Sequence, residues 1–270
     1  MRKILGKRYL WPWLVAVGAV VLAFAPTALS TLKAQSDSEG KAFDYVVTMT
    51  NLTSGQPMSP PMAATHEDAG VVWSLGQKAS FALKEIAENG NNAPMYYDLQ
   101  QARQAGSVYD LAQGVSTQLF PSPIVPAGRA GPGAGKTPFP QSVTFRIRGN
   151  PENDRLSVAS MLVCTNDGFT GVTGLALPKA KGKSVTVSLQ AYETGTELNN
   201  QLLENMMPPC QGLIGVRSST LASGEAVSRP ALLENGTIGM HAGLTAGVGD
   251  LAPIHAWRGT VGEITVTRVA

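Results

Sequence analysis

The chain has 270 residues, of which 43% are hydrophobic and 15% charged, a composition that is typical of a globular protein and unlike that of a disordered or fibrous one. Its formal net charge is +2, but the first 34 residues hold five basic and no acidic residues, which leaves 16 basic against 19 acidic residues in the remainder. This mildly acidic balance excludes an extended basic surface, so we expect no nucleic-acid partner.

The N-terminal segment has the pattern of an export signal. Four basic residues precede a stretch from Tyr9 to Leu32 that carries no charge. Within it, an apolar run from Leu14 to Ala25 is followed by proline and small residues, as in signal peptides. We predict that residues 1–34 are cleaved and that the mature protein is periplasmic or secreted. The alternative is an uncleaved anchor, because the uncharged stretch is long enough for a bilayer core of about 20 residues.

The rest of the chain is predicted to form mainly strands. Four segments alternate β-branched with polar residues, which predicts strands, at 45–49, 142–147, 184–189 and 263–267. One apolar stripe with helical spacing runs from Ala79 to Glu88, and a second short helix is expected after Pro94. Strands near both ends and no regular alternation of strand and helix predict an all-β, antiparallel β-sandwich with a short helical insertion.

A proline- and glycine-rich stretch, residues 121–140, is expected to be a surface loop. It contains Ala130-Gly-Pro-Gly-Ala-Gly-Lys-Thr137, which approaches a phosphate-binding loop. Such a loop follows a buried strand and begins a helix, whereas Thr137 is followed by Pro-Phe-Pro. We therefore expect no nucleotide partner.

The histidines offer the main enzymatic alternative. His66, His241 and His255 are the only histidines, and neither a zinc-protease motif nor a Gly-x-Ser-x-Gly motif is present. A Ser-His-acid site, or a copper or zinc site formed by the three histidines in space, stays open as an alternative. Without supporting spacing, we expect His66 and His241 to bond turns and His255 to pack beside Trp257, and we predict no catalytic role.

Two short loops carry the strongest candidates for a metal site. The first contains Asp167 within Asn-Asp-Gly, and the second places Glu193 and Glu197 on either side of Thr-Gly-Thr. Calcium prefers six to eight oxygen ligands, which carboxylates and loop carbonyls supply. The same acids could instead be solvated loop residues or turn caps.

A family resemblance favours the metal site. The run from Ser160 to Val172, followed by Tyr192-Glu-Thr-Gly-Thr-Glu197, resembles the spondin domain, the N-terminal-type domain of F-spondin and mindin, in the form found in bacterial exported proteins. The resemblance extends over about residues 43–268, and we take residues 42–270 as the domain. It implies a C2-like antiparallel β-sandwich with a role in binding or adhesion.

The resemblance also implies one calcium ion, bound by loop aspartates. The family's first aspartate corresponds to Asp167, and its aspartate pair corresponds to Glu193 and Glu197. Here the sequence departs from the family pattern, because both residues of the pair are glutamates and Gly168 replaces a tryptophan. The longer glutamate side chain would shift the ion or change its coordination.

The only two cysteines, Cys164 and Cys210, enclose all three proposed ligands in sequence. In an exported protein, two cysteines most simply form one disulfide. Two free buried thiols are the alternative. We therefore predict a non-catalytic binding or adhesion module of the cell envelope, with a calcium-stabilised loop end and an unknown protein or glycan ligand. The remaining alternatives are the histidine-based enzyme or metal-handling protein and a membrane-tethered accessory subunit.

Overall fold

The computed structural model describes residues 42–68, 70–113, 141–207, 210, 232–245, 248–251 and 255–270. Residues from Lys41 to Ala270 form one compact unit. The predicted signal segment and the predicted loop at 121–140 lie outside the described residues. No helix within the described ranges is long and apolar enough to cross a membrane.

The described residues contain nine strands and two α-helices. The strands are β1 (Phe43–Asn51), β2 (Met62–His66), β3 (Asp110–Gln113), β4 (Ser142–Gly149), β5 (Arg155–Met161), β6 (Gly168–Ala176), β7 (Ser184–Glu193), β8 (Gly239–Met240) and β9 (Gly262–Arg268). The helices are α2 (Phe81–Asn89) and α3 (Ala93–Gln104), and a 3-10 turn spans Leu203–Asn205. All four predicted strands and both predicted helices are confirmed.

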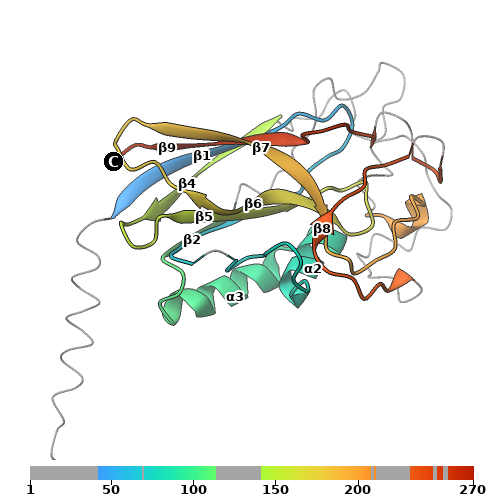
Figure 1. Cartoon of the computed structure of the whole chain (residues 1–270), viewed down its shortest axis with the longest axis horizontal. Helices are drawn as coiled ribbons and strands as arrows, with labels where there is room; N and C mark the ends of the chain where they lie inside the picture. Colours follow the sequence, from blue (N-terminus) through green and yellow to red (C-terminus); the bar gives the residue numbers. More distant parts are fainter. Residues whose placement is uncertain are drawn as a thin grey trace, which may run out of the picture. The chain divides into compact units, whose positions relative to one another are not determined.

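The strands form two antiparallel layers that share one long strand (Figure 1). The strand order is β3-β2-β5-β6-β7-β9-β1-β4, and the short β8 pairs with β7. The first half of β7, Ser184–Leu189, pairs with β9, whereas its end, from Gln190 to Glu193, pairs with β6. The two edges also meet, since the Arg148 backbone N–H donates to Asp110 Oδ2 at 2.8 Å. The predicted all-β fold with a small helical insertion is confirmed as a nearly closed antiparallel sheet.

Two hydrophobic clusters fill the domain. One lies between the β layers and includes Val47, Phe145 and Ile264. The other lies between the β2–β5–β6 layer and the helices, which cover that layer from outside (Figure 1). Strand β2 is buried at every position, because Ala63 faces the first cluster while Met62 and Ala64 face the second. The helical insertion therefore belongs to the core.

Helix α2 has clear signals at both ends. The Ser80 hydroxyl accepts a hydrogen bond from the backbone N–H of Leu83 at 3.1 Å, which satisfies a donor that the helix leaves free. At the other end, Gly90 adopts a left-handed conformation with φ of 62° and its N–H bonds back into the helix. These caps fix the length of α2, whose last turn carries the buried Glu88.

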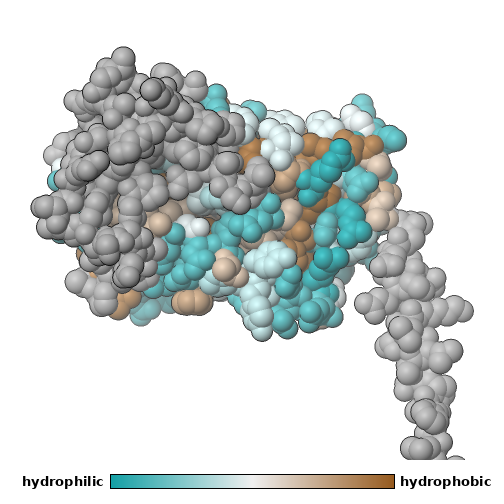
Figure 2. Space-filling model, turned by 180° about the vertical axis from the view of Figure 1, so that it is seen from behind, coloured by the Kyte–Doolittle hydropathy of each residue, from teal (hydrophilic) through white to brown (hydrophobic). Residues whose placement is uncertain are grey.

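The surface of the domain carries both hydrophobic and hydrophilic residues (Figure 2). Figure 2 shows, on the face turned away from the view of Figure 1, hydrophobic areas bordered by hydrophilic residues. A few large hydrophobic side chains are exposed, among them Leu198, Leu233 and Met240.

Candidate functional site

The three predicted carboxylate ligands lie at one end of the sandwich, where β6 begins and β7 ends. Asp167 directly precedes β6, and Glu193 is the last residue of β7, paired with Gly168. The turn after Glu193 comes back over Asp167, because the Thr194 backbone N–H donates to the Asp167 carbonyl oxygen at 3.2 Å. Residues from two distant parts of the sequence therefore meet here.

Asp167 is completely buried, and its two carboxylate oxygens have different surroundings. Oδ2 accepts hydrogen bonds from the Thr194 hydroxyl at 2.9 Å and from the backbone N–H groups of Thr196 at 2.9 Å and Glu197 at 3.3 Å. Oδ1 is buried and has no hydrogen-bond partner among the residues that the structure describes. A buried carboxylate oxygen without a partner is costly. Its position fits a cation, which would satisfy it.

The two glutamates differ in exposure. Glu197 is buried, with 2% of its surface exposed. Glu193 is half-buried, and its Oε2 accepts a hydrogen bond from the Asn199 side-chain amide at 2.6 Å. Burial is the largest cause that raises the pKa of Glu193, and the negative charge of Asp167 raises it further. The hydrogen bond from Asn199 acts in the opposite direction. Asp167 and Glu193 are thus close enough to repel each other, which is the environment that a bound cation relieves.

The three carboxylates are neighbours, but their oxygens do not surround a common point. In the part of the chain that the structure describes, the group of His, Cys, Asp or Glu side chains whose ligand atoms all lie within 4.8 Å of one another is Cys164, Cys210 and His255. Binding of one ion by all three carboxylates would require their oxygens to move closer together. Asp167 is therefore the best-positioned of the three for a metal.

A fourth acidic side chain reaches this site from helix α2 and was not predicted. The Thr196 hydroxyl, 2.7 Å from that of Thr194, donates to Glu88 Oε1 at 2.6 Å. Lys84 Nζ lies 3.2 Å from the other oxygen of Glu88, whose side chain is 1% exposed. A chain of polar contacts thus joins α2 to Asp167. The sequence offers no signal for it, since Glu88 resembles any polar residue of an amphipathic helix.

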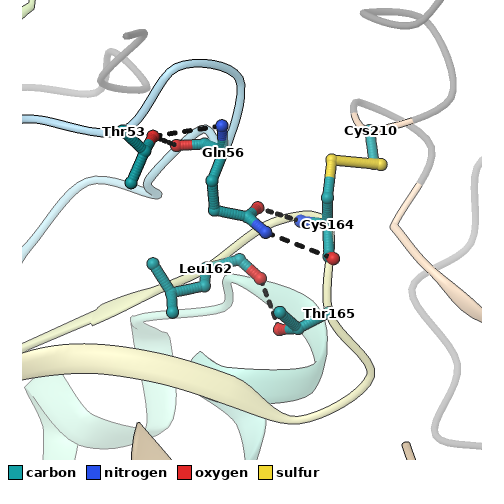
Figure 3. Close-up of a disulfide and its surroundings, with 6 residues drawn as sticks. All are labelled: Thr53, Gln56, Leu162, Cys164, Thr165 and Cys210. Carbon is teal, nitrogen blue, oxygen red and sulfur yellow. Dashed lines mark hydrogen bonds between the residues drawn. A yellow bond between two sulfur atoms is a disulfide. The ribbon is translucent and has the colours of Figure 1, made fainter. Parts of the chain in front are cut away.

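The predicted disulfide between Cys164 and Cys210 is confirmed, and both residues are fully buried. Figure 3 shows the side-chain amide of Gln56 beside the backbone of Cys164, joined to it by two hydrogen bonds. The Cys164 backbone N–H donates to Gln56 Oε1 at 2.6 Å, and Gln56 Nε2 donates to the Cys164 carbonyl at 3.3 Å. Thr165 closes the same turn by donating to the Leu162 carbonyl at 2.6 Å. The loop that carries Asp167 is therefore held at its start by both covalent and polar contacts.

The structure does not bring the three histidines together. His66 lies in β2, and its Nε2 is 2.8 Å from Ser157 Oγ, but both residues are completely buried, so this serine-histidine pair has no access for a substrate. His241 accepts a hydrogen bond at Nδ1 from the Gly243 backbone N–H at 3.0 Å, which confirms its expected role in a turn.

Trp257 packs against a histidine that was not expected there. The ring of His241 contacts it, with 5.1 Å between the ring centroids, and a ring nitrogen of His255 lies close to the sulfur atoms of the disulfide. The expected packing of His255 beside Trp257 stays a prediction. His66 bonds the strand residue Ser157 through Nε2, and it also interacts with the backbone of Asp68, in the bend after β2. Each histidine thus has a separate environment, and a shared copper or zinc site of the three has no geometric basis.

The fold and the loop end define a class of protein: an antiparallel β-sandwich with a helical insertion and a disulfide-held, acidic loop end. A model of the Spondin_N family matches residues 53–205. This match covers more than half of the chain, which therefore belongs to the Spondin_N family, as the sequence resemblance predicted. No curated protein matches the chain. The family and the disulfide both favour a location outside the cytoplasm.

Proposed function

We propose that this protein is an exported, non-catalytic binding or adhesion module whose loop end holds one calcium ion. Its ligands would be Asp167 with Glu193 and Glu197, and the ion would make the loops rigid enough to present a binding surface. The observation that carries the proposal is the buried, unpartnered Oδ1 of Asp167. Calcium is favoured over softer metals because carboxylate oxygens are hard ligands.

The neighbourhood of these loops supports a binding role. Exposed large apolar side chains occur on segments that pair with the loop end: Met240 pairs with Tyr192 of β7, and Leu233 pairs with Glu197. Leu198, whose backbone N–H donates to the Leu232 carbonyl, is also exposed. Apolar groups exposed next to a charged loop are typical of an interaction surface. We propose a protein or glycan of the cell envelope as the partner, in the periplasm or after secretion.

Calcium titration of the purified mature domain tests the proposal. We expect heat of binding and a rise in melting temperature for the unmodified protein, since a ligand of the folded state stabilises it. Asp167→Asn should lose both effects because the amide removes the charge. The matched control is Asp98→Asn, the same change at an exposed site on α3. If calcium has no effect on the unmodified protein, or if Asp167→Asn responds as strongly, the calcium site is wrong.

A pull-down from envelope extracts, with and without a chelator, tests the binding role separately. We expect the unmodified domain to retain an envelope component that a chelator releases. Binding that is indifferent to both the chelator and Asp167→Asn would limit these loops to a structural role.

A further inference from the structure

The surroundings of the disulfide contain a second group of metal-ligating side chains, unrelated to the carboxylates. A ring nitrogen of His255 and the sulfur atoms of Cys164 and Cys210 all lie within 4.8 Å of one another. His255 is 2% exposed and both cysteines are fully buried. Two sulfur atoms and one imidazole nitrogen thus converge in the protein interior.

The residues around this group are also rich in soft donors. Met161 and Met206 belong to the same buried cluster as the two cysteines, and Met207 packs against it. Thiolate and thioether ligands select soft cations, above all Cu(I). Calcium, by contrast, takes oxygen ligands, so this group and the carboxylate loops would not compete for the same ion.

We propose that the reduced form of this protein binds one Cu(I) ion through Cys164 Sγ, Cys210 Sγ and a ring nitrogen of His255. The number of ligands favours copper over zinc, because structural zinc sites are almost always closed by four protein ligands. The described residues supply three His, Cys, Asp or Glu ligands here. Cu(I) accepts three ligands, and a neighbouring methionine thioether is a further donor that it accepts and zinc does not favour.

The sulfur atoms of Cys164 and Cys210 can either form the disulfide or bind the metal ion, but not both at once. A dithiol reductant transfers two electrons and two protons to the Cys164–Cys210 bond, which breaks to give two thiols while the donor becomes a disulfide. Cu(I) then binds both sulfur atoms as thiolates, and the two thiol protons are released to solvent. A second disulfide, as the two-electron acceptor, would oxidise the two thiolates to the Cys164–Cys210 bond, become a dithiol by taking up two protons from solvent, and so release the Cu(I) ion.

The distances required for the metal-bound form are compatible with this region. Two thiolates bound to one metal at about 2.3 Å lie roughly 4 Å apart. Once the sulfur–sulfur bond is broken, the two atoms must separate to about this distance in any case, since they are then only in van der Waals contact. The imidazole nitrogen is already within 4.8 Å of both, so binding requires side-chain adjustment and no change of fold.

Competition with a Cu(I)-specific chelator tests the proposal. The full mature protein is reduced with dithiothreitol, freed of the reductant without oxygen and titrated into a Cu(I)–bicinchoninate complex. We expect one Cu(I) per reduced chain and none per oxidised chain. His255→Gln should weaken binding at least about tenfold, the lower end of what changes in metal-site residues cost. The matched control His241→Gln, at a buried histidine beside Trp257, should leave the affinity unchanged.

A second variant separates ligation from folding. His255→Cys loses the same imidazole packing but keeps a soft ligand, so it should retain Cu(I) binding where His255→Gln loses it. Circular dichroism of each reduced variant reports its fold. Equal affinity of His255→Gln and the unmodified protein would overturn the proposal, because two cysteines alone would then explain the binding. Displacement of Cu(I) by an equal concentration of Zn²⁺ would overturn the assignment of the metal.

Discussion

The turn between Glu193 and Glu197 depends on one glycine, and the sharpest test of the loop end is the change Gly195→Ala. Gly195 has a φ of +68°, the left-handed region that favours glycine. A methyl group added there would lie 2.7 Å from the Thr237 nitrogen, 2.8 Å from the Thr237 oxygen and 2.9 Å from the Gly236 carbonyl carbon. All three atoms belong to backbone, so the segment that carries Thr237 would have to move.

Gly182→Ala provides a matched control. Gly182 has a similar φ of +76°, but nothing lies within 4 Å of the methyl group that alanine would add. Both changes therefore incur the cost of a left-handed alanine, about 1–2 kcal/mol, less the gain of about 0.4–1 kcal/mol from a more restricted unfolded chain. Only Gly195→Ala adds the cost of overpacking, about 1–3 kcal/mol. The difference between the two variants isolates the close approach.

Urea unfolding of both variants and the unmodified domain measures these free energies. We expect Gly182→Ala to cost about 0–1.6 kcal/mol and Gly195→Ala to cost about 1–3 kcal/mol more. In thermal melts, each kcal/mol should lower the melting temperature by about 2–4 °C for a domain of this size. Equal losses in the two variants would refute the reasoning, because the contact of Gly195 with Thr237 would then be absent in solution.

Two further predictions concern buried groups. Burial lowers the pKa of His241 from 6.5 to about 4. As the pH falls, His241 is therefore protonated in the unfolded chain before it is protonated in the folded protein. The free energy of unfolding should fall between pH 6.5 and 4, by up to about 3 kcal/mol at 1.36 kcal/mol per pH unit. Urea unfolding at pH 7 and pH 4.5 should show a smaller difference in His241→Gln; an equal difference would contradict the burial of the ring. Reduction of Cys164–Cys210, which are 46 residues apart, should lower the free energy of unfolding by about 4 kcal/mol at most on the loop-entropy model. Urea unfolding with and without reductant measures this, and an unchanged midpoint would contradict a structural role of the disulfide.

The sequence predicts strands well where one face of the strand is polar. Strand β4 alternates buried and exposed residues from Val143 to Arg148, so its period of two is visible in the sequence. Strands β2 and β5 are buried on both faces, the first along its whole length and the second after Arg155. Their alanines, serines and methionines carry no alternation, because helices cover the face that would otherwise be polar. The layer beneath the helices therefore could not be predicted from periodicity.

Some residues of the candidate loop-end site could be predicted from the sequence and others could not, as with the strands. Asp167, Glu193 and Glu197 lie in short glycine-containing turns, which the sequence shows directly, and the structure confirms that these turns meet. Glu88 could not be predicted, because its role depends on how α2 packs against the sheet. The position of His255 beside the disulfide was not predicted, because no sequence pattern links this histidine to the two cysteines.

The pairing of Gln56 with Cys164 has one more consequence. The side-chain amide offers an acceptor and a donor to the N–H and C=O of a single residue, which is what an adjacent strand offers in an antiparallel ladder. Gln56 thus acts as a surrogate peptide group that extends the backbone pairing to Cys164, three residues beyond Met161, the end of β5. A glutamate at this position would have the same shape but could only accept, so it would leave the Cys164 carbonyl without its donor. The beginning of the acidic loop is therefore specified by the chemistry of one amide.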